Sequence, residues 1–241
     1  MKYKKSELDI FLQEQIRKNE EELCLNLDAT LQYEQNCLEE ILCGIKHSKS
    51  NIENCNKVLE KVPISDMAVW NAKKEAFKDN LVIWNTLGHI QMASIEMKRY
   101  TKVLSSDNDD WVKYDTIKSA YTAIYETSKK LVDSTGKLMK FINYEFPSYD
   151  FSSFKEVRKE LAKFREDNTN MLTSVKNKID AHRDEDVCMQ IETAENLHLA
   201  DAVKMIVDYE CFVNKLGAVV SPMKQLGLLR LESVFYKNKQ W

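Results

Sequence analysis

The chain has 241 residues, of which 44% are hydrophobic and 30% are charged, a composition typical of a folded globular protein rather than a disordered one. The net charge is −3, so no overall positive field would attract nucleic acid, and such binding would require a local patch. Only five glycines and three prolines are present, which is too few to punctuate a protein of many strands and favours long helices.

Membrane-spanning and secreted proteins are also disfavoured. No apolar run approaches the roughly 20 residues that cross a bilayer. The N-terminal MKYKK is not followed by the apolar segment of a secretory signal. The six cysteines form no CxxC pair, so zinc spacing is absent and small buried thiols in a reducing compartment are expected. We therefore expect a cytoplasmic protein without membrane partners.

The first element is expected from Ser6 to Lys61, as one very long helix or two helices in line. Apolar residues recur there every seven positions, at Leu31, Leu38, Ile45, Ile52 and Leu59. The row four residues earlier is mixed, so only half of a coiled-coil seam is present. We interpret this arm, residues 1–62, as a helix lying along a bundle, with a dimerisation arm as the alternative. Gly44 is a point where the helix is expected to bend.

Residues 63–241 are expected to form the bundle itself. After Pro63, Ser65 and Asp66 are predicted to cap a second helix, whose aromatic residues Trp70, Phe77 and Trp84 recur every seven positions. Such a stripe indicates core packing. The acidic run 105–110 lacks the central Gly and the final Glu of a calcium loop, and is interpreted as a turn that caps the next helix.

Three more main helices and a short terminal one complete the prediction. The third is expected over Trp111–Phe146 and ends before Pro147, and the fourth opens with a capping box at Ser153–Glu156. A fifth runs from about Met189 to Leu216. A short helix after Pro222 is expected to cover the bundle end. The sequence therefore predicts an all-α fold, an antiparallel helical bundle with a long N-terminal helical arm.

The densest chemistry lies in residues 176–184, Lys-Asn-Lys-Ile-Asp-Ala-His-Arg-Asp. The apolar stripe of the fourth helix leads into this segment through Phe154, Val157, Leu161, Phe164, Met171, Val175 and Ile179. His182 lies about 20° around the helix axis from Val175, so it continues the buried side and needs a polar partner there. Lys178 is about 40° from His182, whereas Lys176 is about 120° away. Lys176 can meet His182 only if the helix unwinds between them or a second subunit takes part.

The pattern Lys176-Asn177-(x)4-His182 resembles the signature of the HEPN superfamily, in which an arginine and a polar residue precede a histidine. The wider string KNKIDAHRD is similar to the version found in an abortive-infection branch of that superfamily. The helical stretch after Pro63 resembles the bundle of that superfamily in kind. The usual arginine is Lys176 here, which keeps the charge but loses the two-pronged guanidinium.

The resemblance implies binding or metal-independent cleavage of RNA by a homodimer, without a cofactor, in a phage-defence or toxin–antitoxin system with an antitoxin-like protein partner. It implies that His182 acts on the attacking 2′-hydroxyl or the leaving oxygen, and that Lys176 stabilises charge on the phosphate. Asn177 would hold the geometry. Lys178 and Arg183 are the candidate RNA-binding residues.

Two other interpretations remain open. In a non-catalytic interaction or scaffold protein, His182 would contact the last carbonyls of its helix, and its cationic neighbours would form a solvated face. In a metal protein, Glu195 and His198 would share one face of a helix. A di-iron bundle needs a second Glu-x-x-His, which is absent, so a mononuclear site from His182, His198 and a carboxylate is the remaining metal hypothesis.

Overall fold

The computed structural model describes residues 6–106, 109–176 and 197–236, and every regular element within these ranges is a helix. In chain order these are α1 (Glu7–Leu59), α2 (Ile64–Leu104), α3 (Asp110–Glu145), α4 (Ser152–Val175), α6 (Leu199–Val220), the 3-10 turn η2 (Ser221–Met223) and α7 (Lys224–Tyr236). The helices pack into a bundle, which confirms the predicted all-α fold. No described helix combines the length and the apolar character needed to cross a bilayer.

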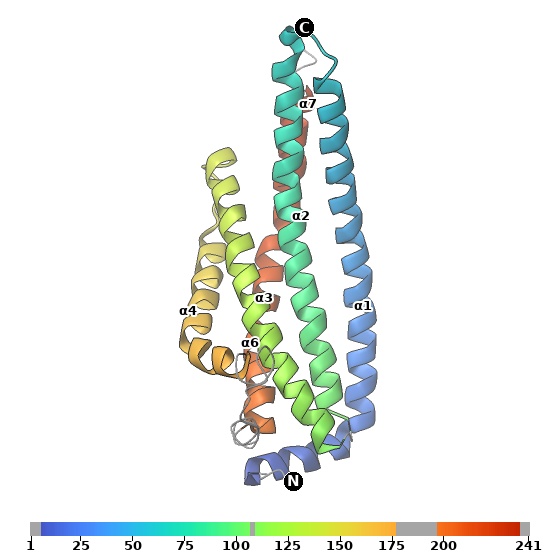
Figure 1. Cartoon of the computed structure of the whole chain (residues 1–241), viewed down its shortest axis with the longest axis vertical. Helices are drawn as coiled ribbons and strands as arrows, with labels where there is room; N and C mark the ends of the chain where they lie inside the picture. The colour runs from blue at the N-terminus through green and yellow to red at the C-terminus, as the bar shows by residue number, and fades with distance from the viewer. Residues whose placement is uncertain (1–5, 107–108, 177–196, 237–241) are drawn as a thin grey trace, which may run out of the picture.

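Helix α1 is one continuous helix of 53 residues that packs lengthwise against α2 (Figure 1). Its first turns lie across the end of the bundle, near the start of α6. The row of Ile41, Ser48 and Cys55 is buried, more deeply than most of the apolar heptad row that the sequence suggested. Helix α1 therefore lies along α2 within the chain, and a role of this arm in dimerisation stays a prediction.

Glycine brings α1 and α2 close together. The helix continues through Gly44, so the bend expected there is not the reason for a glycine. A Cβ atom on Gly44 would lie 2.4 Å from ring carbons of Trp84 in α2. On the facing side, a Cβ on Gly88 would lie 3.6 Å from both Ile41 and Ile45. The missing side chain at Gly44 is thus what allows the indole to lie against the α1 backbone.

The N-terminal cap of α3 agrees with the sequence-based prediction, whereas the N-terminal caps predicted for α2 and α4 are not observed. Asp109 caps α3, because its carboxylate accepts the N–H groups of Trp111 and Val112 at 2.8 and 3.0 Å. Neither Ser65 nor Ser153 caps its helix, since α2 and α4 already include these serines. The predicted capping interactions at these two positions were therefore wrong, although the helices exist.

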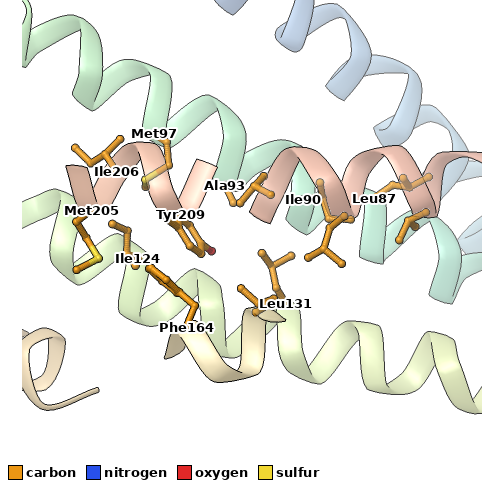
Figure 2. Packing of buried hydrophobic residues seen from close by; sticks show 14 of the residues in the cluster. Leu87, Ile90, Ala93, Met97, Ile124, Leu131, Phe164, Met205, Ile206 and Tyr209 are labelled. Atoms are coloured by element: carbon orange, nitrogen blue, oxygen red, sulfur yellow. The ribbon is translucent and has the colours of Figure 1, made fainter. Parts of the chain in front are cut away.

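The main core lies between α2, α3, α4 and α6 (Figure 2). At its centre, Tyr209 of α6 stacks on Phe164 of α4 with ring centroids 5.7 Å apart. The Tyr209 hydroxyl and the Thr127 hydroxyl of α3 are 2.8 Å apart, so the buried phenol has a hydrogen-bond partner. Helix α4 therefore packs against both α3 and α6, which also contact each other.

A buried ion cluster joins α1, α2 and α6. The Lys98 ammonium lies 3.0 Å from Glu34 and 2.7 Å from Glu210, and only 8% of the Lys98 side chain is exposed. Burial alone would lower the pKa of Lys98, but hydrogen bonds from its ammonium to Glu210 and Glu34 and the charges of these residues raise it. The cluster therefore holds a charged lysine between three helices.

Two expectations about smaller features need correction. Of the five cysteines in the described ranges, all are free thiols, but Cys43 and Cys211 are exposed and only Cys55 is buried. The short helix α7 was expected to cover the end of the bundle with its leucines. Leu226 is buried, as this expectation requires, but Leu229 is 51% exposed and does not take part in the covering. Helix α7 packs mainly along α2.

Candidate functional site

The predicted site begins where α4 ends. Lys176 is the C-cap residue of α4, and its backbone N–H donates to the carbonyl oxygens of Leu172 and Thr173. The other candidate residues, Asn177, Lys178, His182 and Arg183, lie outside the described residues. The structure therefore locates the first residue of the motif and the helix that leads into it.

The apolar stripe of α4 continues up to the motif. Helix α4 buries Phe154, Leu161, Phe164, Leu172 and Val175, and Val175 directly precedes Lys176. Met171, which the sequence placed in this stripe, is 38% exposed, and Leu172 takes its place. The part of the stripe that the structure describes thus runs along the packed side of the helix.

The Lys176 side chain is held against α3. Its ammonium forms an ion pair with Glu126 and lies 4.6 Å from the ring centroid of Tyr125. The hydrogen bond from Lys176 is the main reason why the pKa of the Glu126 carboxyl is lowered. Both side chains are partly exposed, so a phosphate can reach Lys176 but must compete with Glu126.

His198 lies at the same end of the bundle but not on a helix. It is the N-cap residue of α6, with extended backbone angles of φ −91° and ψ 140°. Helix α6 begins at Leu199, so the helix predicted from about Met189 does not run through Leu197 and His198. The hypothesis that Glu195 and His198 share one helical face is therefore wrong.

A buried carboxylate fixes the position of His198. Asp9 of α1 is fully buried and accepts the N–H groups of Ser6 and Ala200, each at 2.9 Å. Its Oδ2 also lies 3.2 Å from Nδ1 of His198. Burial alone would raise the pKa of Asp9, but the hydrogen bonds of Ala200 and Ser6 and the charge of His198 lower it.

Sequence reasoning missed the role of Asp9. The Ser6 hydroxyl accepts the Asp9 N–H at 3.1 Å, which completes a capping box that the pattern Ser6-x-x-Asp9 could have revealed. The contact with His198, 189 residues away, has no local signal in the sequence.

A groove of about 390 Å³ opens beside His198. Three helices and the segment before α6 line this groove. The lining residues are Tyr121 of α3, Phe164, Asn168 and Met171 of α4, and Leu197, His198, Asp201, Lys204, Met205 and Asp208 at the start of α6. The lining combines apolar and aromatic side chains with polar and charged ones. Because the Asp9 carboxylate can only accept, Nδ1 of His198 is assigned as the donor, which leaves Nε2 as the ring nitrogen that can bind a polar group.

Among the residues that the structure describes, no group of three or more His, Cys, Asp or Glu side chains is placed to hold a metal ion. The metal hypothesis involving His182 falls outside the described residues. No protein-family model, curated protein or solved structure matches the chain. The function is therefore inferred from the residues of the chain itself.

Proposed function

We propose that this chain acts on RNA, by binding and slow cleavage, at the end of the bundle where α4 stops. The observation that carries the proposal is Lys176, the first residue of the HEPN-type motif, which directly follows the buried stripe of α4 and is partly exposed. The setting implied by the motif is a cytoplasmic homodimer of a phage-defence or toxin–antitoxin system, with an antitoxin-like protein partner.

The proposed chemistry needs no metal. His182 would accept the proton of an RNA 2′-hydroxyl as its oxygen attacks the neighbouring phosphorus, or donate a proton to the leaving oxygen. Lys176 would stabilise the charge that develops on the phosphate, and Asn177 would orient it. Lys178 and Arg183 would contact the RNA backbone.

The residue type and the ion pair of Lys176 favour RNA binding over RNA cleavage as the stronger of the two proposed activities. A lysine presents a point charge in place of the fork of an arginine, so it fixes the orientation of a phosphate less well. In addition, the Lys176 ammonium already forms an ion pair with the Glu126 carboxylate. A phosphate must displace this carboxylate, which makes the transition state harder to stabilise and the cleavage slow.

The test compares wild-type protein with His182→Ala on a labelled single-stranded RNA in excess chelator. Cleavage should fall at least about 100-fold in this variant, the usual contribution of general acid–base catalysis. The matched control is His47→Ala, since His47 is exposed on α1 and contacts Asn51 at 3.0 Å. This control should cleave and bind RNA as the wild type does.

Two results would count against the proposal. Equal cleavage by wild type and His182→Ala would remove His182 as the catalytic residue. A wild-type protein that neither binds nor cleaves RNA would remove RNA as the substrate.

The second candidate function is a non-catalytic interaction module. The first turns of α1 support it, because Leu8 and Phe11, one helical turn apart, are 59% and 58% exposed. Exposed large apolar side chains at this spacing suit a partner helix. In that case the wild type should show no RNA cleavage, and His182→Ala should leave a complex with a protein partner intact.

A further inference from the structure

A second groove, of about 350 Å³, lies between α2 and α3, and Lys176 is not among its lining residues. Its lining consists of Lys78, Leu81, Val82, Asn85, Thr86 and His89 of α2, and Ser134 and Lys137 of α3. The α2 residues lie three or four positions apart for the most part, so they share one face of the helix. They span eleven positions, or about 16 Å along the axis, which makes the groove elongated.

The lining carries hydrogen-bond donors and positive charge. None of the described lining residues is a carboxylate. Within the described chain, Lys137 is exposed and has no ion pair or hydrogen bond, whereas Lys78 pairs with Glu75 at 2.8 Å. The Thr86 hydroxyl donates to the Val82 carbonyl at 2.8 Å. The Lys137 ammonium is therefore a cation that is available to a ligand.

The charges of two lysines act on His89 in the lining. Burial lowers the pKa of His89, and the nearby charges of Lys130 and Lys137 lower it further. Two carboxylates outside the lining interact with Lys130. Burial raises the pKa of Glu96 while Lys130 and Arg99 oppose the rise, and Lys130 also contributes to the lowered pKa of Glu126. Two lysine charges thus act on a half-buried imidazole, and no carboxylate is among the lining residues of the groove.

These lysines line up with the candidate site along α3. Lys130 lies about 40° around the axis of α3 from Glu126, the partner of Lys176, and Lys137 lies about 20° from Glu126 on the same side. From 126 to 137 the axis rises by about 16 Å. One side of α3 therefore carries Lys130 and Lys137, and Lys176 contacts the same side through Glu126. Together the three lysines form a track longer than a single phosphate group.

We propose that the groove beside His89 is a phosphate-binding site, in which Lys137 of the lining provides the charge, Lys130 adds to it from outside the lining, and Asn85 provides a neutral hydrogen bond. The assignment of RNA as the source of the phosphate rests on the proposed function, because the track would continue the RNA backbone beyond Lys176. A free phosphate compound is the other source of the same chemistry.

The experiment compares Lys130→Gln/Lys137→Gln with a matched double variant, Lys46→Gln/Lys49→Gln, which removes the same charge from exposed positions on α1. One arm measures the binding of inorganic pyrophosphate by calorimetry. The other measures single-stranded RNA binding by fluorescence anisotropy between about 50 and 200 mM salt. The groove variant should bind pyrophosphate at least about tenfold more weakly. Its slope of log K against log salt should fall by about 1.4, because each lost phosphate contact contributes about 0.7.

The outcomes separate the groove from the proposed function. If RNA binds to the wild type and the groove variant changes neither its slope nor pyrophosphate binding, the inference is overturned and the proposed function survives. If pyrophosphate binding depends on the groove but the wild type binds no RNA, the groove is supported and the proposed function fails. Equal losses in the α1 control would also overturn the inference, since a general loss of charge would explain them.

Discussion

The Asp9 carboxylate joins the start of α1 to the start of α6. It caps the start of α1 through Ser6 and anchors the start of α6 through Ala200 and His198. A buried carboxylate that accepts several N–H groups is stabilised in its charged form, and protonation removes part of that interaction. The link between the two helix starts should therefore depend on pH.

The first prediction concerns Asp9→Ala. The folded-state pKa of Asp9 lies below the ordinary value of 3.8, so its contribution to stability is present above that pH and is lost as the pH falls through the folded-state pKa. At pH 7 the substitution should lower the free energy of unfolding by about 1–3 kcal/mol, the cost of leaving buried donors unsatisfied.

Urea unfolding of the wild type and of Asp9→Ala at pH 7 and at about pH 3 measures this difference, which should shrink at the lower pH. Asp28→Ala is the control, because Asp28 is 55% exposed in its ion pair with Lys102 and should have an effect below about 1 kcal/mol. A difference for Asp9→Ala that is the same at both pH values would show that its charge is not what stabilises the fold.

At the scale of elements, the pairing of α1 with α2 depends on one close approach. Trp84 lies against the backbone of α1 at Gly44, so any side chain there would overlap the indole. Cores tolerate such overpacking poorly, because the neighbouring ring must shift away from its packed position.

The second prediction is that Gly44→Ala lowers the free energy of unfolding by about 1–3 kcal/mol, although alanine favours a helix more than glycine does. Gly217→Ala is the matched control in α6. Its added Cβ would lie at an ordinary contact distance of 3.7 Å from Ile90, so it should stabilise the protein by about 0.4–1 kcal/mol. Chemical denaturation of both variants checks the signs. Stabilisation by Gly44→Ala would contradict the close packing of Trp84 on α1.

At the scale of the whole molecule, helical periodicity was sufficient to predict the bundle and the stripe of α4, because each helix buries one face at a regular spacing. The caps of α2 and α4 were mispredicted, since the start of a helix depends on its flanking residues, such as Pro63, and not on a serine alone. The pairs Asp9–His198 and Lys176–Glu126 join residues distant in the chain, so only the packed fold reveals them.

The same limit applies to the candidate site. The motif that begins at Lys176 was visible as a local string, whereas the groove beside His89 combines residues of α2 and α3 about 48 positions apart, such as Thr86 and Ser134. No local pattern brings these residues together. The packed structure therefore brings His89 of α2 and Lys137 of α3 together in one groove.

The most direct test of the central claim is to locate bound RNA on the chain. Single-stranded RNA that contains 4-thiouridine can be cross-linked to the wild-type protein by ultraviolet light, and the modified peptides identified by mass spectrometry. The account predicts cross-links within residues 176–183, with further ones near Lys130 and Lys137 of α3. Cross-links confined to α1 or α7, or no cross-linked peptide at RNA concentrations that saturate known RNA-binding controls, would contradict it.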